Sequence, residues 1–190
     1  MTIDPTPWLV DHARLLPSAG DALDVASGSG RNAVWLAARG LSTLAIDRDA
    51  EKIEAIRQTA AVRALPLRGE VIDLETDVVS DFLGPPKLGT SEGGSRTYDV
   101  IVVVHYLHRP LFPALRDALE PGGILVYETF TRAQAQRGKP TNPAFLLEPG
   151  ELRELVAPLE VLAEREGDFE GKMLASVIAR RRAPSSWRRR

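Results

Sequence analysis

Short apolar runs alternate with helix-like stretches along most of this chain, and this alternation limits its fold more than any other feature. Three of the runs occupy residues 22–26, 41–46 and 100–104. The last one, four valines and one isoleucine, is typical of a strand buried on both faces of a sheet. Strands that alternate with helices predict parallel strands. We therefore expect an α/β fold, a Rossmann-like, doubly wound, mostly parallel sheet with helices on both faces.

Further elements continue this pattern. Strand signals lie at 71–72, at 124–127 after a Pro-Gly-Gly turn, and in a terminal antiparallel pair, 161–162 with 173–179. Glycine and proline punctuate residues 83–97, which predicts a surface loop. Helices are predicted at 8–16, from the turn that follows residue 26 to residue 39, and at 49–62, 110–119 and 151–156.

The length and composition of the chain restrict its class. Its 190 residues suffice for one domain with a sizeable core. The absence of cysteine excludes disulfides, thiolate metal sites and cysteine nucleophiles. No apolar run reaches the roughly 20 residues of a membrane-spanning helix, and the N-terminus has no leader pattern, so we expect a cytoplasmic protein. His105 and His108 lie three residues apart but without a Glu-x-x-His pattern, so no metal site is predicted.

The charge is distributed unevenly. Residues 180–190 carry six arginines and no acid, and without them the chain has 18 basic and 26 acidic residues. An acidic body argues against a broad surface that follows a phosphate backbone. We therefore expect one domain over 1–180 and a basic, disordered tail over 181–190, which leaves a contact with nucleic acid or an acidic membrane open.

The run at 22–26 leads directly into Ser27-Gly28-Ser29-Gly30, a glycine turn between a strand and a helix. Gly28 and Gly30 allow backbone angles and a close ligand approach that a β-carbon would obstruct. Such a turn also directs the amides of a helix N-terminus at a carboxylate or phosphate. Alone, Gly28-x-Gly30-x-x-Ala33 equally satisfies the dinucleotide fingerprint or a tight turn without a ligand.

Three other features argue against a dinucleotide. Asp24 lies inside the strand before the turn, where it could receive the amino group of a cofactor that carries an amino acid. Asp73 ends a third strand, where it could recognise an adenine amino group. The turn at 119–123 has no role in dinucleotide binding. Besides these three features, Asp47 ends the second strand, where it could bind ribose hydroxyls. Asp24 and Asp47 could instead cap the helices that follow.

The run at 23–40 resembles motif I of the class I methyltransferases that depend on S-adenosylmethionine (AdoMet). It is similar to the small bacterial branch that includes tellurite-resistance-type enzymes, in which Gly-x-Gly-Arg-Asn is typical. Asp47 matches the ribose acid of the superfamily, Asp73-Leu74 its adenine-contacting motif, and 119–124 its turn before the fifth strand. The superfamily often has glycine where this chain has Ala26.

The resemblance covers roughly residues 7–180 and implies an antiparallel seventh strand at one edge of the sheet. Stretches at 106–112, 127–130 and 142–147 also resemble a less characterised methyltransferase subgroup. AdoMet is the implied cofactor. The residues expected to bind it are Asp24, Ala26, Ser27, Gly28, Gly30, Arg31, Asp47, Arg48, Asp73, Leu74 and His105.

The catalytic candidates follow the fourth and fifth strands: His105, Tyr106 and Glu128. Methyl transfer from a sulfonium is an in-line displacement, so positioning can supply much of the catalysis. A soft or anionic acceptor needs little general base, whereas an amine or hydroxyl can need one nearby. His105 could line the donor pocket, act as a base or be structural. Glu128 could contact the substrate or form a buried ion pair with Arg109 or Arg132.

Two further segments could cover the site. Residues 137–140 could fold over it as a lid, and Trp8 could cover the cofactor, while solvated charges and core packing are the simpler interpretations. The sequence His-Tyr-Leu-His at 105–108 replaces the Asn/Asp-Pro-Pro-aromatic element of many amino and RNA methyltransferases. We therefore expect a small-molecule or oxyanion acceptor. The alternatives are RNA methylation anchored by the tail, a non-catalytic AdoMet-binding module and a nicotinamide oxidoreductase.

Overall fold

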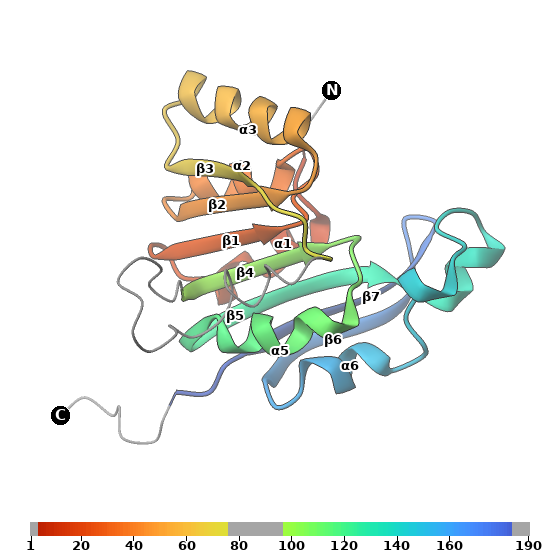
Figure 1. Cartoon of the computed structure of the whole chain (residues 1–190). Helices are drawn as coiled ribbons and strands as arrows, with labels where there is room; N and C mark the ends of the chain where they lie inside the picture. The colour runs from red at the N-terminus through yellow and green to blue at the C-terminus, as the bar shows by residue number, and fades with distance from the viewer. Residues whose placement is uncertain (1–3, 76–96, 184–190) are drawn as a thin grey trace.

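A computed structural model describes residues 4–75 and 97–183, and these form one seven-stranded sheet (Figure 1). The strand order is β3-β2-β1-β4-β5-β7-β6. The strands are β1 (Asp21–Val25), β2 (Ser42–Asp47), β3 (Leu67–Val71), β4 (Tyr98–Val104), β5 (Leu119–Phe130), β6 (Glu160–Phe169) and β7 (Lys172–Arg180).

Strands β1 to β5 pair in parallel, as predicted. Strand β7 runs antiparallel to β5 and to the edge strand β6, so the antiparallel pairing is confined to one edge. The alternation of strands and helices was therefore a sound guide to the doubly wound fold. The terminal pair is longer than the sequence indicated, because β6 begins before residue 161 and runs on to Phe169.

Helices cover both faces of the sheet (Figure 1). Successive strand residues point to opposite faces, and in β4 Ile101 and Val103 pack towards α5 and α6 while Val100 and Val102 pack towards α1 and α2. The helices are α1 (Pro7–Asp11), α2 (Arg31–Ala38), α3 (Ala50–Val62), α5 (Phe112–Asp117) and α6 (Glu151–Val156). Short 3-10 helices are η1 (Ala13–Leu15), η2 (Arg109–Leu111), η3 (Arg132–Gln136) and η4 (Pro143–Phe145).

Two predicted helices differ from the structure. The helix expected at 8–16 is interrupted, because the His12 imidazole Nδ1 lies 2.9 Å from the Trp8 carbonyl oxygen and the chain continues as the 3-10 turn η1. The helix expected at 110–119 begins as η2 and ends at Asp117. It stops there because the Ala118 carbonyl accepts the Tyr98 amide and Leu119 starts the ladder with β4.

The Pro-Gly-Gly sequence at 121–123 is not a separate turn but part of β5. The ladder between β4 and β5 shifts register after Tyr98, so that Val100 pairs with Ile124. A β-carbon at Gly123 would lie 2.9 Å from the Tyr98 carbonyl oxygen, which explains why glycine is needed at this bulge.

The first two arginines of the basic terminus have specific partners. Arg180 pairs with Glu160 at 2.8 Å, and Arg181 donates to the carbonyl oxygens of Asp117 and Leu119 at the end of α5. Residues 184–190 of the expected tail, and 83–96 of the expected loop, lie outside the described residues. In the part of the chain that the structure describes, no helix is long and apolar enough to cross a bilayer.

Candidate active site

The carboxyl ends of β1 and β4 form the crevice at which the strand order reverses. From β1 the chain moves outward to β2 and β3 and then returns to β4, on the other side of β1. Open α/β sheets bind ligands at such a point. Ala26 follows β1 and His105 follows β4, and both adopt the left-handed region, with φ of 53° and 58°. This conformation is uncommon for residues other than glycine and is found at functional sites.

The glycine turn between β1 and α2 is tied to the end of β2. The Gly28 amide, in a residue with φ of 55°, donates to Asp47 Oδ2 at 2.8 Å. A β-carbon at Gly28 would meet no atom within 4 Å, so there is open space beside the turn. Gly30 is the N-cap of α2 with φ of 75°, and a β-carbon there would lie 2.5 Å from Ile56 Cγ1. Packing therefore requires the second glycine, whereas the first leaves room for a ligand.

Asp24 is buried beneath this turn. Its Oδ2 accepts the Ala33 amide at 2.9 Å, so it does cap α2, the alternative role that its position allowed. The side chain is 1% exposed, and burial raises its pKa to about 7, against the opposing effects of the Ala33 hydrogen bond and the charge of Arg31. Asp24 does not line the cavities described below, so its predicted contact with a cofactor amino group stays a prediction.

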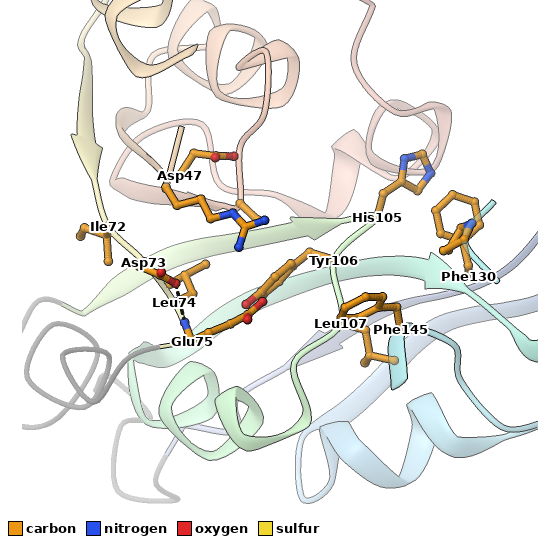
Figure 2. A pocket seen from close by; sticks show the side chains of 13 residues that line it. Asp47, Ile72, Asp73, Leu74, Glu75, His105, Tyr106, Leu107, Phe130 and Phe145 are labelled. Atoms are coloured by element: carbon orange, nitrogen blue, oxygen red, sulfur yellow. Dashed lines mark hydrogen bonds between the residues drawn. The ribbon is translucent and has the colours of Figure 1, made fainter. Parts of the chain in front are cut away.

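A first cavity of about 290 Å³ extends along the carboxyl ends of the strands (Figure 2). Asp47 and Ile72 lie at one end of it, Tyr106 in the middle, and Phe130 and Phe145 at the other end (Figure 2). The structure thus brings together predicted residues from four separate strand ends. These are Ala26, Asp47, Arg48, Asp73, Leu74, His105 and Tyr106.

The end of this cavity near β2 and β3 combines carboxylates with an apolar wall. Asp47 accepts the amides of Gly28 and Asp49, at 2.8 and 3.0 Å, which fixes the orientation of its carboxylate. Asp73 accepts the Glu75 amide at 3.0 Å, and its neighbour Leu74 is buried in the core. Carboxylates beside an apolar surface suit a ligand that has hydroxyl groups and a flat, weakly polar ring.

His105 lies in the middle of the site and is uncharged at neutral pH. Burial, together with the positive charges of Lys172 and Arg31, lowers its pKa to about 4, while Glu128 has the opposite effect. Its ring stacks on Phe130, with centroids 4.6 Å apart. An imidazole in this state can accept a hydrogen bond or pack against a ligand, but it is a weak base.

Tyr106 presents an unpaired hydroxyl to the cavity. Burial raises its pKa to about 12, so the phenol keeps its proton at neutral pH. The hydroxyl is buried and has no hydrogen-bond partner among the described residues, and the same holds for Ser27 Oγ in the glycine turn. Buried polar atoms are nearly always paired, so both can receive a ligand's polar groups.

Arg109 holds the far wall of the first cavity. Its guanidinium pairs with Glu151 at 2.5 Å and donates to the carbonyl oxygens of Ala144 and Leu146, at 3.0 and 2.9 Å. These bonds fix both neighbours of Phe145, whose side chain faces the cavity (Figure 2). Pro140, from the segment predicted to be a lid, lines the same wall.

A second cavity, of about 330 Å³, shares His105 with the first. Two other predicted residues, Arg31 and Glu128, line it. The predicted ion pair of Glu128 with Arg109 or Arg132 was wrong. Glu128 pairs with Arg165 at 3.0 Å, because both side chains stand on one face of the sheet at the level of Ser176, to which each is in register.

Glu128 is satisfied inside the protein. Its Oε1 accepts the Thr6 hydroxyl at 2.7 Å, and its Oε2 accepts the Ser176 hydroxyl at 2.7 Å besides Arg165. The Arg165 guanidinium in turn lies over the Trp8 ring, 4.6 Å from its centroid. The predicted catalytic role of Glu128 stays a prediction, and its contacts are those of a structural ion pair that holds the N-terminal segment on the sheet.

Several residues of the site were not among the predicted site residues. Leu107, Phe130 and Phe145 lie in stretches that resemble a methyltransferase subgroup, but their apolar side chains look like core residues in a sequence, and the structure shows that they line the first cavity. Thr6, Arg165 and Lys172 reach the second cavity only through the antiparallel pairing and the fold of the N-terminal segment. Within the described residues, no cluster of three histidine or acidic side chains could hold a metal ion.

A crevice with a glycine turn, an oriented carboxylate and an apolar wall is typical of ligand sites on doubly wound sheets. A family model described as a methyltransferase domain matches residues 6–165. The chain belongs to this family and is a methyltransferase. No curated protein matches the chain.

Solved structures share the fold. The chain is similar to TehB from Haemophilus influenzae, with a TM-score of 0.73, 20% identity and coverage of 92% of this chain and 61% of that one. It thus spans less than two thirds of TehB. It is also similar to a SAM-dependent methyltransferase from Methanosarcina mazei, with a TM-score of 0.67, 19% identity and coverage of 95% and 100%.

A third similar structure is a coclaurine N-methyltransferase bound to N-methylheliamine and S-adenosylhomocysteine. Its TM-score is 0.61 and its identity 13%, and the match covers 84% of this chain and 49% of that one. At these identities the three likenesses establish the common architecture.

Proposed function

We propose that this methyltransferase transfers a methyl group from AdoMet to a small molecule or a small oxyanion. The observation that carries the proposal is the first cavity, because residues that motif spacing assigned to the cofactor line it at the switch point of the sheet. The methyltransferase family of the chain supports the reaction. The two solved methyltransferases of the same fold that are named for SAM, or hold S-adenosylhomocysteine, support the donor.

AdoMet fits the groups that the cavity offers. The Asp47 carboxylate, already oriented by two amides, would accept the ribose hydroxyls. Ile72 and Leu74 would flank the adenine, with Asp73 near its amino group. The unpaired Ser27 and Tyr106 hydroxyls would each gain a partner, and the open space beside Gly28 would admit the ligand close to the backbone.

The part of the chain's own residues in the reaction is mainly positioning. When bound, AdoMet supplies a methyl group on a sulfonium, and an acceptor lone pair forms the new bond as the bond to sulfur breaks. Because His105 is uncharged at neutral pH, it adds no positive charge beside a cationic donor. Phe130 and Phe145, the latter fixed through Arg109, would exclude water from the reacting groups.

The acceptor in this proposal is small. The two cavities measure about 290 and 330 Å³ and meet at His105, which leaves room for a donor and a compact acceptor rather than a macromolecule's surface. An RNA acceptor held by the arginine tail has less support, because Arg180 and Arg181 are engaged in contacts within the domain.

Three finer statements belong to the same proposal. Membership of the tellurite-resistance-like branch is supported by Gly28-x-Gly30-Arg31-Asn32 and by the fold shared with TehB. A single methyltransferase domain over 1–180 is supported by one continuous sheet. The cytoplasmic location stays a prediction.

The test is a calorimetric titration of the purified protein with AdoMet, S-adenosylhomocysteine and NADH. We expect micromolar binding of the first two and no response to NADH, because Asp47, Asp73 and the unpaired hydroxyls match an adenosyl group with an amino-acid arm. Binding of NADH in preference to AdoMet would overturn the proposal and return the glycine turn to its dinucleotide interpretation.

A further inference from the structure

The second cavity opens on the face of the sheet that α1 and α2 cover. Thr6 borders it from the N-terminal segment, Arg31 from the first turn of α2, and Lys172 from the start of β7. His105 separates it from the first cavity. A group held here lies against the residue that also borders the proposed donor site.

Most charges around the second cavity are neutralised within the protein. Glu128 pairs with Arg165, and the Arg165 guanidinium is enclosed between Trp8 and Phe169, 4.6 and 3.9 Å from their ring centroids. Asp168 pairs with Arg137. These pairs form the wall of the cavity and leave no net charge for a ligand.

Two cations are left over. Arg31 and Lys172 are half-buried, and neither side chain makes a hydrogen bond or ion pair with any residue that the structure describes. The two carboxylates at the cavity without such a partner, Asp11 and Glu170, are exposed at its rim. Two half-buried cations therefore line the cavity without a paired carboxylate among the described residues, and a half-buried cation without a counter-ion favours an anion beside it.

His105, which borders both cavities, lines the second one together with these two cations. Burial lowers the pKa of His105, and the charges of Lys172 and Arg31 act in the same direction. Arg31 stands in the first turn of α2, directly after the glycine turn, where its sequence position assigned it to the cofactor. Lys172 comes from β7 and lines the second cavity but not the first.

We propose that the second cavity binds the methyl acceptor and that the acceptor is an anion, with a carboxylate or small oxyanion group paired with Lys172. This inference rests on the proposed function, because it takes the first cavity as the donor site. An anionic acceptor also agrees with the weak basicity of His105. A neutral hydroxyl or an ammonium would need a base with a pKa near the working pH, whereas an anion arrives with its lone pair available.

The test measures anion binding to the complex of the protein with S-adenosylhomocysteine. Calorimetry with acetate, benzoate and sulfate, and with the uncharged analogues acetamide and benzamide, should detect binding of at least one anion and none of the analogues. Lys172→Gln should weaken that anion's binding roughly tenfold, the typical loss of one charge-assisted hydrogen bond. Lys172→Arg should preserve the binding. Lys52→Gln, which removes an α3 lysine paired with Asp49, is the matched control and should change nothing.

Each result has one meaning. Failure of all three anions to bind, equal binding of an anion and its amide, or an unchanged affinity in Lys172→Gln would overturn the inference. Lys172→Gln should keep its affinity for S-adenosylhomocysteine, and a loss there would mean that Lys172 serves the donor instead. If the unmodified protein does not bind S-adenosylhomocysteine at all, the proposed function itself fails.

Discussion

The two cavities that meet at His105 are assembled in different ways. The first is lined from consecutive strand ends, with Ala26 just after β1, Asp47 at the end of β2 and Asp73 just after β3. The second joins distant parts of the chain, such as Thr6 and Glu128, which are 122 residues apart. A site whose residues lie at the ends of successive parallel strands can therefore be predicted from the sequence. A site whose residues are brought together by the register between strands cannot.

The largest effect is expected in the first cavity, from loss of Asp47. Asp47→Ala removes the proposed acceptor of two ribose hydrogen bonds, each worth about 1.5–3 kcal/mol with a charged partner, so AdoMet affinity should fall by roughly 100-fold or more. It also frees the Gly28 amide. Calorimetry measures the affinity, and circular dichroism verifies that the fold is intact.

Asp49→Ala is the matched control for this change. Asp49 caps α3 through the amides of Glu51 and Lys52 but does not line the first cavity. Its loss should lower the stability of the fold through the lost helix cap and leave AdoMet affinity unchanged. If Asp47→Ala binds AdoMet as tightly as this control does, Asp47 does not bind the ribose. The first cavity would then not be distinguished from the second by a ribose-binding carboxylate.

In the second cavity the expected loss is of stability. Glu128→Ala leaves Arg165 and the Thr6 hydroxyl without their buried partner, so the free energy of unfolding should fall by about 3–5 kcal/mol. Urea unfolding measures this quantity, and Glu128→Gln, which keeps the shape, serves if the alanine variant does not fold.

The control is the exposed ion pair of Arg153 with Glu164. Glu164 lies on β6 next to Arg165, the partner of Glu128. Glu164→Ala should cost at most about 1 kcal/mol, because water screens exposed pairs. If Glu128→Ala lowers the free energy of unfolding no more than Glu164→Ala does, the buried ion pair does not hold the N-terminal segment on the sheet. The second cavity would then depend less on strand register than its contacts indicate.

The smallest effect concerns pH, because two buried groups oppose each other. The folded protein keeps a proton on Asp24 that the unfolded chain has released, so this group makes stability fall as pH rises from about 4 to about 7. Folded His105 stays neutral where the unfolded chain binds a proton, so it makes stability rise from about pH 4 to about 6.5. The two slopes should largely cancel over that shared range.

In Asp24→Asn, the dependence of stability on pH that His105 causes should no longer be cancelled. The asparagine still accepts the Ala33 amide, so stability should now decline as pH is lowered from about 6.5 towards 4, by at most about 1.4 kcal/mol per pH unit and less because water partly screens His105. His105→Asn should produce the opposite slope. Urea unfolding across this pH range measures both, and equal slopes in both variants would contradict the opposed assignments.

How far the sequence predicts the site depends on the range of the interactions. The glycine turn, Asp47 and Asp73 were located correctly because each follows an apolar run, and a parallel sheet brings such ends to one edge. Asp24 was placed in its strand, but its burial and its bond to Ala33 came from the structure. The partner of Glu128 was predicted wrongly because nothing near residue 128 in the sequence points to residue 165.

The sequence by itself determined the class of fold, the methyltransferase resemblance and the strand-end positions of Asp47 and Asp73. Local apolar periodicity and the conformational demands of glycine act over a few residues, so they can be recognised in the sequence alone. Only the tertiary structure decided the partner of Glu128, the left-handed backbone at Ala26 and His105, and the cavity that contains Lys172. These depend on strand register and burial, which arise from the packing of segments far apart in the chain.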